Sequence, residues 1–523
     1  MIPIVVVEAP ERWPFEVEGV EVVTAREYLT DPKYQELRGA AVYNLCRRYG
    51  YQTLGYYVSL LAQARGHRPL PSVATLQALH LSPVMRSVSN EVDDLVQRVL
   101  RPLRSADFDL SIYFGRNLAR RYDPLARALF NEFPAPMLRA RFRRDPDPEA
   151  EKGFGPWRIH AIRLVAGTDV PDDHVPFVLE QAARFFRRRA PVVPREAKWS
   201  LAILWDPEDP SPPSNERAIR KFIRAAAELG IHAEVLSPDD TGRIVEYDAL
   251  FLRETTGVDH RTYRLARRAE HEGLVVVDDP ESIIRCSNKV FQAEAFQRHR
   301  IPAPRTLVVH RGNVDEIEGE VGLPCVLKRP DGAFSQGVVK AKDAAGLEEE
   351  LPALFAQSDL LVAQAWTPST FDWRIGVLGG EPLYACRYHM AKGHWQIIRA
   401  PVDRTPEEET SESGDLGGER PGSSAPKGGT SGSGTPGSER SYGRVETVPL
   451  EEAPEAIVRT AVRAARLMGQ GLYGVDLKDV DGRALVIEVN DNPNIEFGYE
   501  DRVLGDELYL TIMRHFLHRL EAR

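Results

Sequence analysis

Residues 474–490 read Gly-Val-Asp-Leu-Lys-Asp-Val-Asp-Gly-Arg-Ala-Leu-Val-Ile-Glu-Val-Asn, and this stretch decides the fold of the C-terminal half. It predicts two strands joined at a turn. Side chains alternate along a strand, so Val486, Glu488 and Asn490 are expected on one face. The intervening apolar residues are expected to pack on a core: Leu485, Ile487 and Val489. Two oxygen donors on so apolar a strand indicate a face that lines a site, although a surface hairpin with scattered acids remains the plain alternative.

The loop of this hairpin decides whether Asp476 joins the polar face. A two-residue turn at 481–482 pairs residue 476 with 487 and turns Asp476 away. A three-residue loop at 480–482, with Gly482 in the left-handed conformation, pairs 476 with 486 instead. We predict the three-residue loop, because it gathers three oxygen ligands of the kind that Mg²⁺ takes.

Two lysines upstream complement these acids. Lys328 follows an apolar run and precedes the Gly/Ser loop 332–338, and Lys289 opens a predicted helix after Asn288. Lysines are point charges suited to phosphates, and glycines let backbone N–H groups approach them closely. Either lysine alone is a weak signal, since hairpin turns and surface lysines look the same. Together with the acidic hairpin they predict a site for a magnesium nucleotide.

A second predicted hairpin turns at Gly379-Gly380. Its arms carry Arg374 and Arg387, whose guanidinium forks bind carboxylates and phosphates bidentately. Its polar neighbours are Asp372, His389 and Lys392. A structural histidine is the more ordinary interpretation of His389 than a catalytic base.

Composition bounds the remaining possibilities. The chain has 523 residues, which suggests about three to four domains of roughly 100–200 residues each. A net charge of −10 argues against nucleic acid as a partner. Four widely spaced cysteines indicate neither a zinc site nor a disulfide framework, so a reducing cytoplasm fits best. No stretch approaches 18 apolar residues, and residues 1–8 are interpreted as a first strand rather than a signal peptide.

The pattern along the chain predicts a multidomain protein of the α/β and α+β classes. Residues 1–190 mix helix and strand signals, and residues 198–285 alternate strand and helix, which favours a largely parallel sheet. Over residues 286–400 the sequence pattern changes to one that predicts β-hairpins. Residues 403–440 are rich in Gly, Ser, Pro and Glu and are predicted to be disordered. A final helix is expected from Asp506 to about Leu520.

The order of these motifs resembles that of the ATP-grasp ligases, most closely the RimK-type glutamate ligases and the glutathione-synthase-like enzymes. The resemblance implies an N-terminal RimK-like-associated α/β domain over 1–190. It further implies a parallel-sheet pre-ATP-grasp domain over 198–285 and an ATP-grasp domain of two α+β subdomains over 286–523. The cofactors implied are ATP and Mg²⁺, with Mn²⁺ as a substitute.

The resemblance also assigns roles to single residues. It places Lys289 and Lys328 on the nucleotide phosphates. Further nucleotide contacts are implied for the phosphate loop, the adenine segment and one acid: Ser335, Gln336, Gly337, Val338, Gln364, Ala365, Trp366 and Asp372. Arg374, Arg387 and Lys328 become catalytic, and the metal ligands become Asp476, Glu488 and Asn490. Two departures stand out: Gln364 replaces the usual hinge acid, and Asp491-Asn492-Pro493-Asn494 replaces a small-residue segment. Arg440, Gly443 and Arg444 are candidates for the arginine and glycines that the family carries near the site.

The implied activity is ATP-dependent joining of a carboxylate to an amine through an acyl phosphate, with small molecules or peptides as substrates. Glutamate or another amino acid is the expected addition, in a cytoplasmic homo-oligomer. Two alternatives keep the fold and change the chemistry. One is an ATP-binding regulatory or scaffold protein, and the other is a kinase-like enzyme that stops at phosphorylation.

Overall fold

The computed structural model describes residues 3–10, 19–37, 40–80, 90–147, 154–188, 197–209, 211–331, 337–391, 395, 398–399, 441–442 and 444–523. They belong to two compact units. The first comprises Met1–Ile284, Asp491–Phe497 and Leu504–Arg523, and the second comprises Arg285–Asn490 and Gly498–Val503. Within the described ranges no helix is both long and apolar enough to cross a membrane. The segment 403–440, for which disorder is predicted, lies outside the described residues, and the domain boundaries stay a prediction.

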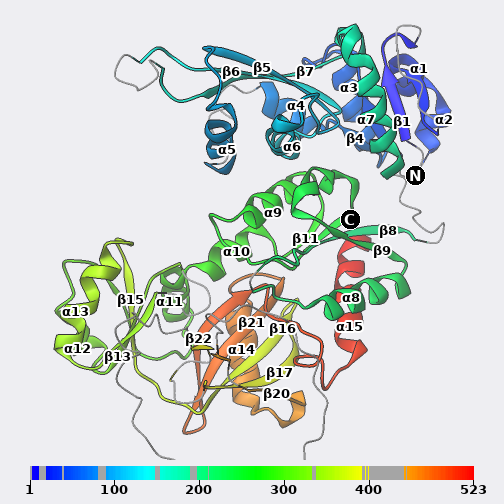
Figure 1. The fold of residues 1–523 in the computed structure, drawn as a ribbon. Helices are drawn as coiled ribbons and strands as arrows, with labels where there is room; N and C mark the ends of the chain where they lie inside the picture. Colours follow the sequence, from blue (N-terminus) through cyan, green and yellow to red (C-terminus); the bar gives the residue numbers. More distant parts are fainter. Residues whose placement is uncertain are drawn as a thin grey trace, which may run out of the picture. The chain divides into compact units, whose positions relative to one another are not determined.

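The first unit begins with a parallel sheet whose strand order is β2-β1-β3-β4. Figure 1 labels β1 and β4 of this sheet. Its strands are β1 Pro3–Val7, β2 Glu21–Thr24, β3 Ala41–Asn44 and β4 Arg68–Leu70. Its helices are α1 Ala25–Thr30, α2 Pro32–Glu36, α3 Leu54–Ala64 and α4 Val73–His80. The expected first strand is confirmed as β1. Helix α1 starts where it does because Thr24 and Glu27 form a capping box.

A second, antiparallel sheet of the first unit has the order β5-β6-β7. Its strands are β5 Asp107–Tyr113, β6 Met137–Arg143 and β7 Arg158–Leu164. Its helices are α5 Asn90–Leu100, α6 Asp123–Glu132 and α7 Val175–Arg188, with 3₁₀ turns η3 Arg120–Tyr122, η4 Gly167–Asp169 and η5 Asp172–His174. Helices α5 and α6 cover one face of the sheet, because their apolar residues share a core with Leu138, Ala140 and Phe142.

The third sheet of the first unit is parallel, in the order β11-β10-β8-β9, as the alternation over 198–285 predicts. Its strands are β8 Trp199–Leu204, β9 Ile231–Leu236, β10 Ala249–Leu252 and β11 Val275–Val277. The helices are α8 Glu216–Glu228, α9 Arg261–His271, α10 Pro280–Ser287 and α15 Asp506–Glu521, with the 3₁₀ segment η6 Pro238–Glu246. The expected C-terminal helix is confirmed as α15, which packs on α8 through Phe222 and Tyr509, whose ring centroids lie 4.8 Å apart.

The second unit contains an antiparallel sheet of order β12-β15-β13-β14. Its strands are β12 Thr306–Val309, β13 Cys325–Lys328, β14 Val338–Ala341 and β15 Leu361–Ala365. The helices are α11 Lys289–Arg298, α12 Glu316–Glu320 and α13 Ala344–Phe355. The predicted helix start is confirmed: the Asn288 side chain accepts a hydrogen bond from the Phe291 N–H, and this cap places Lys289 in the first turn.

The other large sheet of the second unit has the order β20-β17-β16-β21-β22. Its strands are β16 Phe371–Leu378, β17 Glu381–His389, β20 Val445–Val448, β21 Leu472–Val480 and β22 Arg483–Asp491. Helix α14 Glu455–Ala465 covers one face, next to the 3₁₀ turn η7 Leu450–Glu452. A separate pair joins β18 Ile398–Arg399 and β19 Ser441–Tyr442. The hairpin at Gly379-Gly380 is confirmed.

The predicted loop of the acidic hairpin is wrong. Strand β21 ends at Val480 and β22 begins at Arg483, so the turn has two residues, Asp481 and Gly482. Their φ values of 51° and 78° are both positive, as a type I′ turn requires. Asp481 tolerates this conformation because aspartate visits the left-handed region more readily than most residues.

The face assignment along β22 is also wrong in part, and the reason is a bulge. Val486 is fully buried in the α14-covered core together with Val489, which lies three residues later. The N–H groups of both residues leave the sheet: Val486 donates to the Pro302 carbonyl at 2.8 Å and Val489 to Gln292 Oε1 at 2.8 Å. Equivalent positions recur every two residues in a regular strand, so one extra residue lies between them.

Candidate active site

The central sheet of the second unit has an apolar face and a charged face. Trp373, Ile375 and Val377 belong to the core that includes α14. The residue between the first two, Arg374, stands opposite Asp476 on β21 and therefore points to the other face. Two alternating strands thus bring charges from distant segments of the sequence onto one surface.

Arg374 and Asp476 form a buried, bidentate ion pair. The guanidinium Nε and Nη2 donate to the two Asp476 oxygens at 2.7 and 2.6 Å. Asn490 Nδ2 donates to Asp476 Oδ2 at 3.1 Å, so two of the three predicted metal ligands touch. The bulge in β22 explains this contact despite the two-residue turn, because the extra residue moves Asn490 back onto the face of Asp476.

Glu488 lies beside the first of the predicted lysines. Lys289 Nζ is 3.8 Å from Glu488 Oε2. Burial alone would raise the pKa of Glu488, but Lys289, Lys328 and Arg374 outweigh it and hold that pKa below its ordinary value. The carboxylate therefore stays ionised, which is the form that ligates a metal.

Lys328 is held at the end of β13 with its ammonium buried. Its Nζ donates to Gln364 Oε1 at 2.8 Å, and Gln364 Nε2 donates to Thr306 Oγ1 at 3.2 Å. Burial lowers the pKa of Lys328 to about 8; Glu488 opposes the shift, and Lys289 and Lys478 add to it. An anion bound here would relieve the repulsion among these ammonium groups.

The segment predicted to contact adenine uses its N–H groups within the protein. Ala365 N donates to the Arg305 carbonyl at 2.8 Å and Trp366 N to the Pro324 carbonyl at 3.2 Å. Adenine recognition through these two N–H groups would require those bonds to be exchanged. The Trp366 ring carries Lys340 Nζ at 3.6 Å from its centroid, a cation–π contact that sequence reasoning missed.

Arg387 does not join Arg374. It stands opposite Trp373 on the core side of the hairpin, with its guanidinium 4.8 Å from the Trp373 ring centroid. It lies 3.8 Å from Glu446, which also contacts His389 at 3.2 Å. Arg444 pairs with the same glutamate at 3.1 Å. These contacts are structural in kind, and the catalytic role of Arg387 stays a prediction.

Part of the predicted phosphate loop lies outside the described residues, namely Ser335 and Gln336. The same holds for Lys392, Arg440 and Gly443. Gly337 is described, with φ of +70°, and a β-carbon there would come within 2.1 Å of Arg329 Nε. The positive φ favours glycine there, and Val338 follows it as the first residue of β14.

One further cation on the charged face was missed. Lys478 Nζ contacts Asp372 Oδ1 and Ser369 Oγ, each at 2.5 Å. It lies two residues after Asp476 on the same strand, so side-chain alternation could have found it. Asp372, predicted to contact nucleotide, is therefore the acid partner of a lysine.

The donor set is chemically suited to magnesium. Asp476, Glu488 and Asn490 offer two carboxylates and one amide, all hard oxygen donors. Among the described residues no three His, Cys, Asp or Glu side chains gather as a metal site. The predicted set has only two carboxylates, so the fit rests on the amide of Asn490 and on further oxygens from a bound phosphate.

The segment Asp491–Phe497, which follows Asn490, belongs to the first unit and is hydrogen-bonded there by Arg253. This arginine is fully buried and donates to Asn492 Oδ1 at 2.7 Å and to the Pro493 carbonyl at 2.9 Å. It also donates to Ser214 Oγ at 2.9 Å. The departure of Asp491-Asn492-Pro493-Asn494 from the family pattern thus supplies partners for a buried cation.

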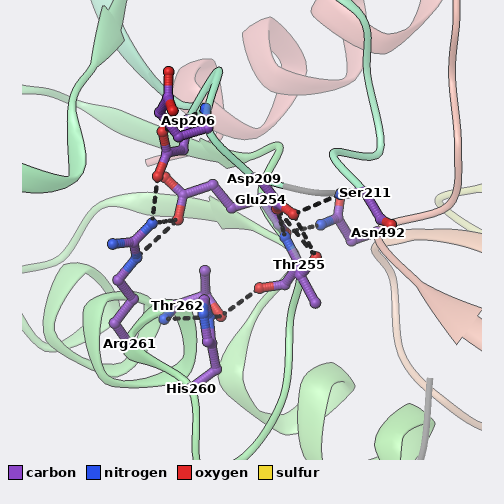
Figure 2. A network of polar contacts seen from close by, with 10 residues as sticks. Asp206, Asp209, Ser211, Glu254, Thr255, His260, Arg261, Thr262 and Asn492 are labelled. Carbon is purple, nitrogen blue, oxygen red and sulfur yellow. Dashed lines mark hydrogen bonds and ion pairs between the residues drawn. The ribbon is translucent and has the colours of Figure 1, made fainter. Parts of the chain in front are cut away.

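Around this segment lies a polar network at the ends of β8 and β10 (Figure 2). Arg261 links Asp206 and Glu254 at 3.0 Å each, and Asn492 Nδ2 donates to the Glu254 carbonyl at 2.5 Å. Asp209 accepts from the Thr255 N–H at 3.0 Å. Burial raises the pKa of Glu254 to about 7 against the opposing charge of Arg261.

Comparison with known proteins agrees with these features. Residues 25–181 match the model of the RimK-like ATPgrasp N-terminal domain. A probable alpha-L-glutamate ligase of Marinomonas sp. (strain MWYL1) is 22% identical over 315 residues, covering 57% of this chain and 90% of the relative. A probable alpha-L-glutamate ligase of Rhodopirellula baltica is 23% identical over 296 residues, covering 53% and 62%. The alpha-aminoadipate–LysW ligase LysX of Saccharolobus solfataricus is 36% identical over 137 residues, covering 25% and 50%.

Solved structures give weaker matches. The D-alanine–D-alanine ligase of Bacillus anthracis is 14% identical with a TM-score of 0.44, covering 62% of this chain and 99% of that one. The chain spans less than two thirds of the length of two of the three sequence relatives named above, those of Rhodopirellula baltica and Saccharolobus solfataricus.

The N-terminal match and the ligase relatives agree with the resemblance seen in the motifs: residues 25–181 match the RimK-like ATPgrasp N-terminal domain, and the chain is similar to glutamate ligases and to LysX.

Proposed function

We propose that this protein is an ATP-dependent ligase that joins a carboxylate to an amine through an acyl phosphate. One observation carries the proposal: oxygen donors and ammonium groups from four separate segments meet on the charged side of the second unit. Asp476 touches Asn490, and Glu488 lies 3.8 Å from Lys289. Lys328 is the buried cation beside them. Such an arrangement matches a triphosphate better than a purely structural ion pair, because its cations exceed what the two carboxylates require.

In the first step a carboxylate oxygen of the acid substrate attacks the γ-phosphorus of ATP, and ADP leaves with the electrons of the broken P–O bond. The chain's contribution is placement and charge. Lys289 and Lys328 neutralise phosphate oxygens, and Arg374 fixes the orientation of Asp476. Asp476, Glu488 and Asn490 would hold Mg²⁺, which supplies Lewis-acid neutralisation of the phosphate charge when bound.

In the second step the amine nitrogen attacks the acyl carbon, inorganic phosphate leaves, and the ammonium proton passes to water. An amide, ADP and phosphate result. The reaction needs no nucleophilic side chain, since the activated group is the substrate's own carboxylate. The protein's role is to hold the acyl phosphate beside the amine.

The relatives suggest the substrate class. Proteins named glutamate ligases and a ligase of alpha-aminoadipate and LysW support an amino acid as one of the two substrates. We extend the proposal to a glutamate or related amino acid, joined to a peptide or small amine. Substitution of Mn²⁺ for Mg²⁺, a homo-oligomeric state and a cytoplasmic location belong to the same proposal.

The test is release of ADP by the purified full chain with ATP, Mg²⁺ and a panel of amino acids, followed by mass spectrometry of the products. ADP release that depends on an added amine, with a product heavier by one amide-linked amino acid, is expected. Turnover by Glu488→Gln should be absent, whereas Asp481→Asn on the exposed turn of the same hairpin should match the wild type. ATP binding without turnover would support the scaffold alternative, and a stable phosphorylated product formed without an amine would support the kinase-like one.

A further inference from the structure

The β5–β6–β7 sheet of the first unit has one face that no core residue occupies along most of its length. Leu138, Ala140 and Phe142 of β6 point into the core beneath α5 and α6. The alternating residues of β6 therefore point to the opposite face, and they are Arg139, Arg141 and Arg143. Helix α7 covers only the end of that face, where Tyr113 and Met137 join its apolar core.

The neighbouring strands add two aspartates, two arginines and one histidine to this face. The register places Asp107 and Asp109 of β5 opposite Arg143 and Arg141. On the other side β7 contributes Arg158, His160 and Arg163, all exposed. We name this surface, formed by five arginines, one histidine and two aspartates, the arginine face.

Two register positions of the arginine face set like charges against each other. Arg143 stands directly opposite Arg158, and Arg139 directly opposite Arg163. Like charges across an antiparallel pair are destabilising. The two aspartates offset only part of the repulsion, since Arg141 pairs with Asp109 at 2.8 Å and Arg143 with Asp107 at 2.9 Å.

Three of the arginines have no carboxylate within contact distance among the described residues. Arg158 and Arg163 lack any ion-pair partner there. Arg139 makes one long hydrogen bond, from Nε to Ser111 Oγ at 3.4 Å. A sheet that keeps unpaired guanidinium groups side by side is at its most stable when an anionic partner lies across them.

We propose that the arginine face binds an acidic polypeptide in an extended conformation. Residues at i, i+2 and i+4 of β6 present guanidinium groups about 6–7 Å apart, because a strand rises roughly 3.3 Å per residue. An extended peptide with acidic residues at alternate positions presents carboxylates at the same spacing. The bidentate pair of Arg141 with Asp109 shows that the face already accepts a carboxylate in fork geometry.

Nucleic acid fits this face less well. Sheets that bind single strands offer exposed aromatic rings on which bases stack. Here Phe108 and Phe142 belong to the opposite, core side, and Tyr113 is buried under α7. The chain's net charge of −10 also opposes a long polyanion such as RNA while leaving room for a short acidic peptide.

The inference goes beyond the proposed ligase activity and does not need it, because binding can be measured without turnover. The probe is a fluorescein-labelled peptide of alternating glutamate and serine, titrated with the full chain and followed by fluorescence anisotropy. We expect saturable binding that weakens with added salt. The double variant Arg158→Ser/Arg163→Ser should weaken it by about tenfold or more, since charge-assisted hydrogen bonds to carboxylates are lost.

The matched control removes two positive charges elsewhere in the same part of the chain. Arg98→Ser/Arg101→Ser changes exposed residues at the end of α5 and should leave the affinity within about twofold. Equal weakening in both double variants, or no binding of the peptide, would overturn the proposal. So would tighter binding of a single-stranded oligonucleotide that the Arg158/Arg163 variant loses. Unchanged ADP release in that variant alongside lost peptide binding would support the inference and leave the ligase proposal intact.

Discussion

Two antiparallel sheets of this protein carry arginine and aspartate in facing positions, yet they treat these charges differently. In β16–β21 the pair Arg374–Asp476 is buried, with side chains 15% and 9% exposed, and is bidentate. In β5–β6 the pair Arg141–Asp109 is also bidentate but is about half exposed, at 49% and 43%. The local geometry is shared, and the difference is access to water.

Burial decides what each sheet can tolerate. A buried charge without a partner costs several kcal/mol, so each group on the charged face of the second unit has a partner or a neighbour of opposite sign. Water screens the arginine face, and unpaired arginines persist there at small cost. Charges of the first kind suit chemistry on a phosphate, and charges of the second kind suit reversible docking.

The largest effect is expected at Glu488. Glu488→Ala removes a proposed metal ligand and the acid partner of Lys289, so turnover should fall by about a thousandfold or more, equivalent to roughly 4 kcal/mol. The measurement is amine-dependent ADP release at saturating ATP. Far-ultraviolet circular dichroism should match the wild type, because Glu488 is not part of the apolar core.

Full activity of Glu488→Ala would contradict the proposed metal ligation. It would also mean that the buried charged face tolerates the loss of a charge as well as the exposed arginine face does. Asp109→Ala serves as the matched control on the arginine face, where removal of an exposed carboxylate should leave turnover unchanged.

The next effect is one of stability, at Arg253. Arg253→Met keeps the volume but removes hydrogen bonds to Ser214, Asn492 and the Pro213 and Pro493 carbonyls. The acceptors are buried, so the free energy of unfolding should fall by about 3 kcal/mol. Urea denaturation measures this, and Arg220→Met on the exposed side of α8 provides a control. An unchanged midpoint would show that the cluster is dispensable.

The sequence indicated which residues come together better than it indicated how they are arranged. Residue type and motif order singled out Asp476, Glu488, Asn490 and both lysines, which lie near one another in the structure, while their role as a site stays a prediction. The bulge between Val486 and Val489 was not predictable, since it depends on N–H bonds to Gln292 and the Pro302 carbonyl, far away in sequence.

The sequence also did not show which charged side chains contact one another. Arg374 and Arg387 look equivalent on the two arms of a hairpin, and only the register shows that they point to opposite faces. Lys478 was within reach of the alternation rule, whereas Lys340 on the Trp366 ring depends on tertiary packing. The placement of arginine opposite arginine in β6–β7 likewise could not be predicted, because it depends on how two strands separated by a loop pair with each other.

A moderate effect with a definite pH dependence is expected at Glu254. Its pKa is about 7 in the folded protein and ordinarily 4.5, so the folded state binds more protons between these values. Its contribution is therefore most favourable below about pH 4.5, and stability is lost as pH rises through 7. Glu254→Gln removes this loss and should stabilise the protein by about 2 kcal/mol at pH 8, with little change at pH 5.

Thermal unfolding at both pH values measures this difference. Arg261 keeps its ion pair with Asp206 in the variant, at 3.0 Å in the native protein, so the charge beside position 254 stays compensated. Glu228→Gln at the exposed end of α8 is the control and should show no pH-dependent change. A lower melting temperature for Glu254→Gln at pH 8 would mean that the ionised carboxylate is stabilising there.

The smallest effects on stability are expected on the arginine face. Their sign tests whether its exposed charges differ from the buried charges of the second unit. Arg163→Ser relieves the repulsion with Arg139, so the free energy of unfolding should rise by up to about 0.5 kcal/mol at low salt. Arg141→Ser removes the pair with Asp109 and should lower it by a similar amount. Both changes should shrink toward zero at about 1 M salt, where charges are screened within roughly 3 Å. Urea denaturation at two salt concentrations measures them. If Arg163→Ser proved destabilising by more than 1 kcal/mol, about twice the largest value expected here, this arginine would be held by the fold and would not be free to dock a partner.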